Sequence, residues 1–333
     1  MEDNSNKRIH AFRNDVLSDL DAVAIAQLIQ TKQASVQEIT EAAIQRAQFV
    51  NPSLNAIELD CFEQALNNKT YIEHGTFAGV PFFFKDNLDY QGLPSNHGSV
   101  AVHARAAANN PKISQQLLDQ GFVVLGKSKL PEFGLNASTE YKDGTATYNP
   151  WHTDYSCGAS SGGSAALVAA GVVPIAHAND GGGSIRIPAA CCGLIGLKPS
   201  RGRTYDSDAA RSLPINIISE GVVTRSVRDT AHFYAGMESS YYNKVLPRIG
   251  LIHGPSKRRL RIGLVPQSIT GVIDTETTQT LKNTGELLQN LGHHVEELAL
   301  PISVSFVNDF SEYWGFLSFM LTTFGKKVFG PEF

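Results

Sequence analysis

Residues Cys157 to Arg203 carry the clearest structural signals in this sequence and read CGASSGGSAALVAAGVVPIAHANDGGGSIRIPAACCGLIGLKPSRGR. A Gly/Ser turn leads into a short Ala-rich helix that stops at Gly171, and the apolar run after it predicts a buried strand. Three consecutive glycines, Gly181 to Gly183, then let the chain turn sharply before Ser184. Such a turn allows several backbone N–H groups to point into one small volume, which is what an oxyanion site requires.

Each part of this stretch also has a plain structural explanation. Serines and glycines ahead of a helix are typical N-cap residues, and a Gly-Gly-Gly turn can simply connect two strands. Three glycines in a row carry a high cost in backbone entropy, however, and this favours a functional reason for the turn.

A second segment, GVPFFFKDNLDYQG (residues 79–92), places Lys85 at the end of an apolar strand. Burial at such a position lowers a lysine pKa from about 10.4 toward the ~7 to 8 that suits a general base. Taken alone, the segment favours a simpler interpretation, in which the lysine stem lies along apolar surface and the ammonium group reaches water.

Composition excludes several classes of protein. The 333 residues include 28 Lys+Arg and 32 Asp+Glu, so the net charge of −4 is not that of a nucleic-acid binder. Hydrophobic residues make up 42% and charged residues 18%, as in a folded protein. The four cysteines, two of them adjacent, form no disulfide framework and indicate a reducing compartment. Without a signal peptide or an apolar run of membrane-spanning length, we expect a soluble, cytoplasmic protein with no membrane or nucleic-acid partner.

Two catalytic patterns match by letter but not by context. GFVVLGKS (121–128) fits a P-loop, yet its four middle residues favour a strand over a glycine-rich loop, and Pro131 interrupts any helix that follows. GASSG (158–162) fits a nucleophile elbow, yet the polar and aromatic NPWHTDYSC before it is no buried strand. His293 and His294, which could complete a Ser-His-Asp triad, lie beside a predicted strand start. No metal-binding spacing occurs, and we expect no cofactor.

Hydrophobic periodicity predicts an α/β fold in three parts. Two N-terminal helices (about 19–50) come first, the second opened by a Ser35-x-x-Glu38 capping box and ended by Asn51-Pro52. A candidate catalytic core that contains the two segments quoted above (about 53–235) and a second α/β part (about 245–333) follow. We expect strands in LNAIEL (54–59), FVVLGKS (122–128), VVPIAHA (172–178), RIGLV (261–265) and HHVEELAL (293–300), and helices in PKISQQLLDQG (111–121) and about 274–291.

Together the segments resemble the amidase signature family, whose motifs are G-[IV]-P-x-x-x-K-D-N, G-G-S-S-G-G-S-A and D-x-G-G-S-I-R-x-P-A-x-x-C-G-x-x-G-x-K-P-[ST]. The spacing is also similar, because Ser160 follows Lys85 by 75 residues and Ser184 follows Ser160 by 24. The likeness extends from about Leu20 to Pro301. The sequence pattern AHxND…GSIRIPA also resembles, more weakly, that of the subgroup of 6-aminohexanoate cyclic dimer hydrolases.

This chain departs from the family pattern at three positions. Ala159 replaces the usual Gly, Asn179 stands where Thr is common, and Gly181 stands where Thr, Ile or Ala is common. Family members are also usually longer, whereas this sequence ends soon after an aromatic-rich stretch. We therefore expect a chain that is shortened at its C-terminus.

The resemblance implies one domain over residues 1–333, an α/β/α sandwich with a central mixed β-sheet covered by helices on both faces. It also implies a Ser-Ser-Lys triad in which Ser184 is the nucleophile, forms an acyl-enzyme, and passes its proton through Ser160 to a neutral Lys85. The oxyanion would be held by backbone N–H groups of Gly181, Gly182, Gly183 and Ser184.

Supporting roles follow from the same resemblance. Asp180 and Arg186 would brace the glycine turn as an ion pair, and Ser161 would support the first turn by hydrogen bonding. The implied activity is hydrolysis of a small linear or cyclic amide. Members of the family often dimerise, so the resemblance also allows a homodimer. The alternatives are the glutamine-hydrolysing component of a tRNA-dependent amidotransferase, or a catalytically impaired scaffold. The sequence does not identify the acyl or amine group of the substrate.

Overall fold

The structure is a computed structural model that describes residues 7–67 and 73–329. The chain divides into two compact units, the first ending at His253 and the second beginning at Gly254. The predicted organisation as one domain stays a prediction, and each unit is described by itself.

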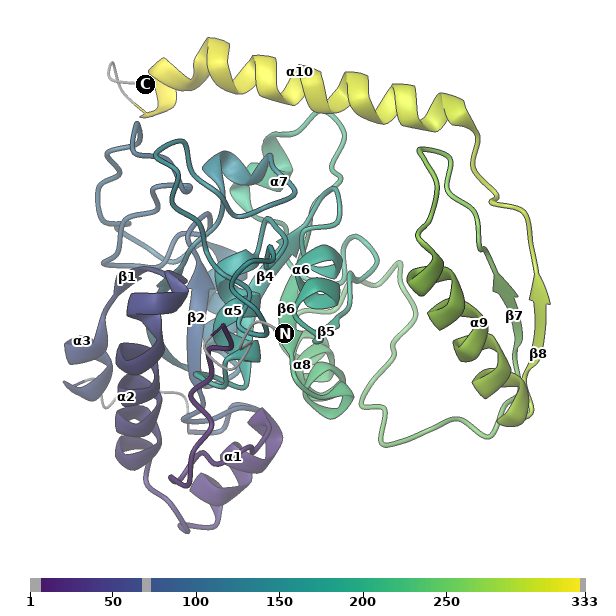
Figure 1. The fold of residues 1–333 in the computed structure, drawn as a ribbon. Coiled ribbons are helices and arrows are strands. Elements are labelled where there is room, and N and C mark those ends of the chain that lie inside the picture. The colour runs from purple at the N-terminus through teal and green to yellow at the C-terminus, as the bar shows by residue number, and fades with distance from the viewer. Residues whose placement is uncertain (1–6, 68–72, 330–333) are drawn as a thin grey trace. The chain divides into compact units, whose positions relative to one another are not determined.

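The first unit contains the motif segments with Lys85, Ser160 and Ser184 (Figure 1). Its elements in chain order are α1 (Ala22–Gln30), α2 (Val36–Leu54), β1 (Ile57–Asp60), α3 (Phe62–Asn67), β2 (Pro81–Lys85), α4 (Lys112–Leu118), β3 (Val123–Ser128), the 3-10 turn η2 (Glu132–Gly134), α5 (Gly162–Ala169), β4 (Ile175–Asp180), α6 (Arg186–Cys191), β5 (Ile195–Gly196), α7 (Asp208–Ser212), β6 (Ser219–Thr224) and α8 (Val227–Ser240).

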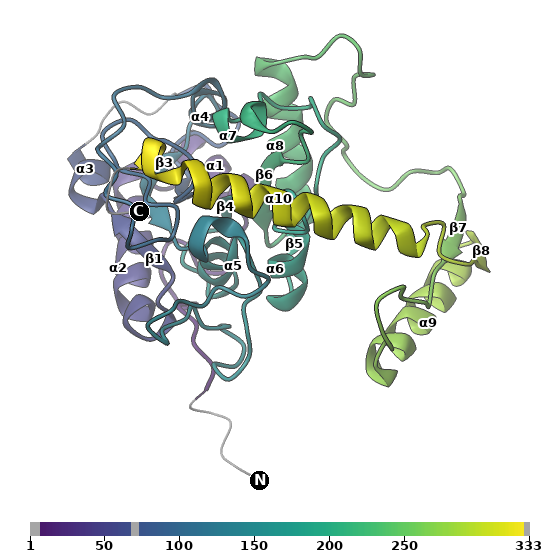
Figure 2. The ribbon, with the colours of Figure 1, turned by 90° about the horizontal axis from the view of Figure 1, so that it is seen from above.

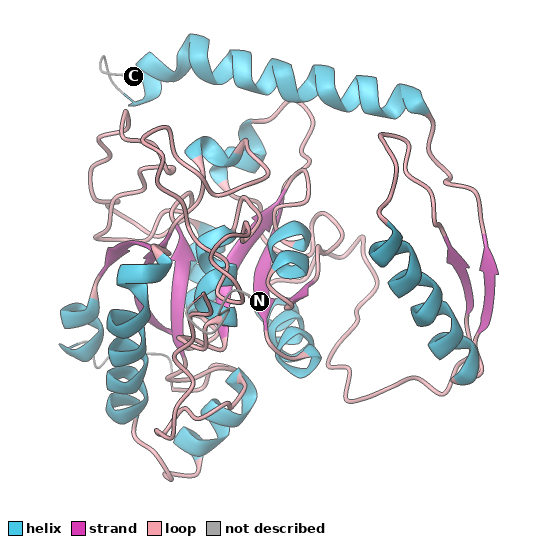
Figure 3. Ribbon diagram, viewed as in Figure 1, coloured by secondary structure: helices cyan, strands magenta, loops and turns pink. Residues whose placement is uncertain are grey.

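The strands of this unit form two three-stranded ladders, one mixed and one antiparallel. The first has the order β1-β3-β2, with β2 parallel and β1 antiparallel to β3. The second has the order β4-β6-β5, with both neighbours antiparallel to β6. Strands β2 and β4 pack side by side, so the ladders make one layer (Figure 3). Figure 2 shows α5 and α6 on one side of this layer and α4 and α8 on the other. The expected α/β fold with a mixed sheet covered on both faces is confirmed.

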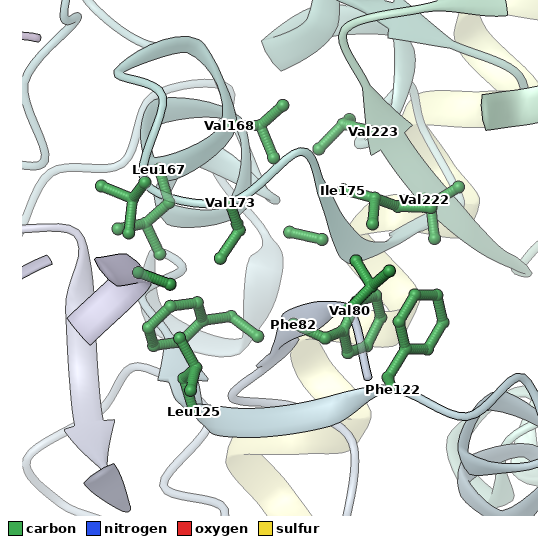
Figure 4. Packing of buried hydrophobic residues seen from close by; sticks show 14 of the residues in the cluster. Val80, Phe82, Phe122, Leu125, Leu167, Val168, Val173, Ile175, Val222 and Val223 are labelled. Atoms are coloured by element: carbon green, nitrogen blue, oxygen red, sulfur yellow. The ribbon is translucent and has the colours of Figure 1, made fainter. Parts of the chain in front are cut away.

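The core lies between the strand layer and its helices because every residue of β2, β3, β4, β6 and α5 is buried. The Phe82 and Phe122 rings stack with centroids 4.2 Å apart, and aliphatic side chains fill the space around them (Figure 4). Close approach explains a glycine at the start of α5: a Cβ on Gly163 would lie 2.5 Å from the Lys129 backbone nitrogen. The Gly/Ser turn therefore also serves packing.

The N-terminal helices begin as the sequence predicts, but the second ends later. Ser35 and Glu38 form the expected capping box at the start of α2. The predicted end at Asn51-Pro52 is wrong, because α2 continues through Pro52 to Leu54. A proline removes one backbone N–H donor from a helix. Just beyond this helix, the Asn51 side chain accepts the N–H groups of Ala56 and Ile57. Asn55 ends the helix in the left-handed conformation, with φ 52°.

The second unit contains the predicted strands and helix. Its elements are β7 (Arg261–Leu264), α9 (Thr275–Asn290), β8 (His294–Glu297) and α10 (Val304–Phe329). Strand β7 runs parallel to β8, with Arg261 opposite His294. His293 accepts the Leu260 N–H through Nδ1 at 3.1 Å, so it serves this strand pair rather than a triad. Within the described ranges, none of the helices has both the length and the apolarity needed to cross a membrane.

Candidate active site

Lys85 ends β2 inside the protein, with no exposed surface. Its Nζ donates to Ser160 Oγ at 2.7 Å and to Asn179 Oδ1 at 2.7 Å. Burial lowers the pKa of Lys85 to about 7, although the negative charges of Glu220 and Asp180 act in the opposite direction. Near pH 7, Lys85 is therefore neutral in a substantial fraction of the protein molecules, and a general base must be neutral to accept a proton.

Ser160 lies in the turn ahead of α5 and is 3% exposed. The peptide bond that joins it to Ala159 is cis. Gly134 closes over the Ser160 side chain, because a Cβ on this glycine would lie 3.0 Å from Ser160 Oγ. In the chain just before Gly158 the structure has only an isolated bridge between Tyr148 and Ser156, so the context of a nucleophile elbow is absent there.

The P-loop pattern forms strand β3, as the apolar residues predict. Its lysine, Lys127, is fully buried and donates to Leu88 O at 2.6 Å and Ser95 Oγ at 2.9 Å. This lysine therefore braces the loop after β2 and does not face a phosphate site.

Asp180 organises the glycine turn at the end of β4. Arg186 donates to the buried carboxylate through Nε at 2.8 Å and Nη2 at 2.9 Å, so the expected ion pair is present. The Gly183 N–H donates to Asp180 Oδ1 at 2.8 Å, and the Ile185 N–H donates to Oδ2 at 3.2 Å. Burial acts to raise the pKa of Asp180, but Arg186 and the N–H donors outweigh it and hold the pKa below its usual value.

This arrangement divides the donors expected to form the oxyanion hole. The Gly183 N–H is engaged by Asp180. The N–H groups of Gly181, Gly182 and Ser184 have no hydrogen-bond acceptor among the residues that the structure describes. They are the donors that the turn leaves available for a developing negative charge.

Ser184 follows this turn and is 8% exposed. Over residues 7–67 and 73–329 its hydroxyl makes no hydrogen bond, so the structure joins Lys85 to Ser160 but does not join either of them to Ser184 by a direct bond. Ser161 Oγ donates to the Asn179 carbonyl at 3.4 Å, in line with its expected supporting role.

One residue of this network was recognised from sequence only as a departure from the family pattern. Asn179 accepts from Lys85 through Oδ1, and its Nδ2 donates to Asn87 Oδ1 at 3.2 Å. Asn87 lies two residues after Lys85 in the K-D-N motif, so the amide pair fixes both the lysine and the loop that follows it. An unusual residue next to the motif aspartate was the available signal.

Comparison with known proteins identifies the family of the chain. The family described as Amidase matches residues 38–327. A Mycobacterium tuberculosis protein named "Putative amidase AmiC" is 49% identical over 98% of this chain and 70% of its own length. The 6-aminohexanoate-cyclic-dimer hydrolase of Paenarthrobacter ureafaciens is 35% identical over 87% of this chain and 62% of its own length.

A solved structure of 6-aminohexanoate cyclic dimer hydrolase in complex with substrate superposes with a TM-score of 0.73 at 33% identity, covering 84% of this chain. This chain spans only 60% of that solved chain. A component of the glutamyl-tRNA(Gln) amidotransferase of Trichodesmium erythraeum is 31% identical over 83% of this chain and 60% of its own length. The family match and the identity over nearly the whole chain show that this protein belongs to the amidase family.

Proposed function

We propose that this protein hydrolyses the carbon–nitrogen bond of a small amide through an acyl-enzyme on Ser184. The observation that carries the proposal is the buried 2.7 Å hydrogen bond between Lys85 Nζ and Ser160 Oγ, in surroundings that lower the lysine pKa to about 7. A lysine–serine pair of this kind can accept and return a proton near neutral pH without a histidine.

Acylation would begin with attack of Ser184 Oγ on the amide carbonyl carbon. The serine proton passes to Ser160, whose own proton passes to neutral Lys85 Nζ. The carbonyl oxygen becomes an oxyanion within reach of the N–H groups of Gly181 and Gly182, which carry no other acceptor among the described residues. Collapse of this intermediate breaks the C–N bond, and the proton returns through Ser160 to the leaving amine.

Deacylation uses the same groups in reverse. The neutral amine leaves, and a water molecule attacks the Ser184 ester while Lys85 and Ser160 again take the proton. Release of the carboxylic acid restores the Ser184 hydroxyl. The Asp180–Arg186 pair takes no part in proton transfer, but it holds the glycine turn that presents the donors.

The proposed substrate is a small amide, with cyclic amides as the first class to test. This choice is supported by 35% identity to a 6-aminohexanoate-cyclic-dimer hydrolase. Glutamine hydrolysis for an amidotransferase is the second candidate, supported by 31% identity to a component of a glutamyl-tRNA(Gln) amidotransferase. The higher identity, 49%, is to a protein named as an amidase.

Hydrolysis assays separate these candidates. Purified protein is incubated with the cyclic dimer of 6-aminohexanoate, a linear aliphatic amide, an aryl acylamide and glutamine, and released amine or ammonia is measured. We expect turnover of at least one non-glutamine amide, abolished in Ser184→Ala and retained in Ser212→Ala, a change at an exposed serine of α7. Undiminished turnover by Ser184→Ala would contradict the proposal, and turnover of glutamine alone would support the second candidate.

A further inference from the structure

A second buried polar pair lies directly against Lys85. His177 on β4 and Glu220 on β6 are diagonal neighbours in the pairing of these strands, with Nε2 and Oε2 3.0 Å apart. Their side chains are 0% and 1% exposed. His177 lies two residues before Asn179 on the same face of β4, and Glu220 is the register partner of Asn179. The pair therefore shares the side of the strand layer that carries the Lys85 contacts.

The hydrogen bonds of His177 fix its tautomer. The backbone N–H of Lys85 donates to His177 Nδ1 at 3.2 Å, so this nitrogen carries no proton. Burial lowers the pKa of His177 and keeps the ring neutral. The ring proton therefore lies on Nε2 and is donated to the Glu220 carboxylate.

The pairing of β2 with β3 places Lys85 opposite Ser128, and the contact with His177 binds the Lys85 N–H on the side of β2 that faces β4. Strands β2 and β4 lie side by side but belong to different ladders. A buried N–H at the edge of β2 needs an acceptor, and the His177 ring supplies one. The imidazole thus fixes the backbone position from which the Lys85 side chain reaches Ser160.

Glu220 contributes charge to the same place. Its Oε1 is buried and has no hydrogen-bond partner in the described part of the chain, so its charge is not fully neutralised by local donors. The ionisable groups around Lys85 are His177 and Asp180 on β4, Glu220 on β6, Lys127 on β3, and Asp86 next in the chain. A carboxylate here favours the ammonium form that Lys85 takes on when it accepts a proton.

We propose that His177 and Glu220 are positioning residues for Lys85: His177 fixes its backbone through Nδ1, and Glu220 supplies the counter-charge for its ammonium form. The catalytic meaning of this pair rests on the proposed amide hydrolysis. Its effect on Lys85 does not, because the protonation of the lysine can be measured without any substrate.

The test compares wild type with Glu220→Gln, which keeps an acceptor for the His177 proton but removes the charge. Lysine labelled with ¹³C at Cε is titrated by NMR, and the Lys85 signal is assigned by its loss in Lys85→Met. We expect the Lys85 pKa to fall by about one pH unit in Glu220→Gln, as one removed charge at protein-like dielectric would produce. Asp229→Asn removes another buried carboxylate, which caps α1, and should leave Lys85 unchanged.

A second variant guards against misfolding of the first. His177→Leu combined with Glu220→Val replaces both members of the pair by apolar side chains, so that neither member is left buried without its partner. It should also lower the Lys85 pKa. An unchanged Lys85 pKa in the folded variants would overturn the proposal.

The acid limb of the pH dependence of kcat/KM should move with the NMR value. If the lysine signal moves in Glu220→Gln but wild type hydrolyses no amide, the positioning role stands and the proposed function fails. If the wild type hydrolyses amides but the Lys85 pKa does not move in Glu220→Gln, the proposed function stands and the positioning role fails.

Discussion

Replacing Lys85 by methionine should remove a pH dependence of stability along with the activity. The pKa of this lysine is about 7 in the folded protein against 10.5 for an unperturbed lysine, because burial disfavours its charged form. The folded pKa lies below the unfolded one, so between these values the unfolded chain binds more protons. The free energy of unfolding therefore rises with pH across this window. Below about pH 7 Lys85 is charged in the folded protein, and the full cost of burying that charge lowers the free energy of unfolding.

The size of the effect follows from linkage. The rise approaches about 1.4 kcal/mol per pH unit once Lys85 is neutral in the folded state, and it amounts to about 2 kcal/mol between pH 7 and pH 9. Methionine has no proton to lose, so this rise disappears in the variant. The lost hydrogen bonds to Ser160 and Asn179 lower stability by similar amounts at both pH values and largely cancel in the comparison.

Urea unfolding at pH 7 and pH 9 measures this quantity. The chain has two tryptophans, and Trp314→Phe in both proteins leaves Trp151 to report on the first unit alone. Wild type should gain about 2 kcal/mol more than Lys85→Met between the two pH values. Lys32→Met, at an exposed position, controls for the loss of a lysine as such. Equal pH dependence in wild type and Lys85→Met would refute the assignment of a depressed lysine pKa.

Three further outcomes follow from the site. The value of kcat/KM should fall below about pH 7, since protonated Lys85 cannot act as a base; a pH–rate profile that stays flat from pH 5 to 8 would contradict this role. Gly134→Ala should lower kcat/KM by roughly 10²-fold in steady-state assays, because the added Cβ would lie 3.0 Å from Ser160 Oγ at a φ of +69°. Arg186→Gln should lower the free energy of unfolding by about 1 to 2 kcal/mol in urea titrations, less than for a fully buried pair because Arg186 is 55% exposed while Asp180 is buried; no loss would argue against bracing of the turn.

Much of the fold could be predicted because its signals are local. Three elements are each indicated by a signal only a few residues long: the Ser35/Glu38 capping box of α2, the apolar run of β3 and the Asp274 cap of α9. The end of α2 could not be predicted, because the last turn of this helix contains Pro52. The Asn51 side chain accepts the N–H of Ala56 just after that turn. Rules based on residue type alone do not include such a side-chain hydrogen bond, so they end the helix at the proline.

The candidate site could be predicted in its members but not in its connections. Lys85 and Ser160 were identified by motif, yet their hydrogen bond joins positions 75 residues apart. The link from His177 to Glu220 depends on the register of β4 against β6, which neither segment encodes alone. The engagement of the Gly183 N–H by Asp180 likewise depends on the conformation of the turn.

Nucleophilic attack by Ser184 is tested most directly by reaction with a fluorophosphonate and identification of the modified serine by peptide mass spectrometry. The modified serine should be Ser184, and the adduct should form much more slowly in Lys85→Met, because the base that accepts the serine proton is gone. An adduct on Ser160 or another serine, or an unchanged rate in Lys85→Met, would contradict the Ser-Ser-Lys assignment.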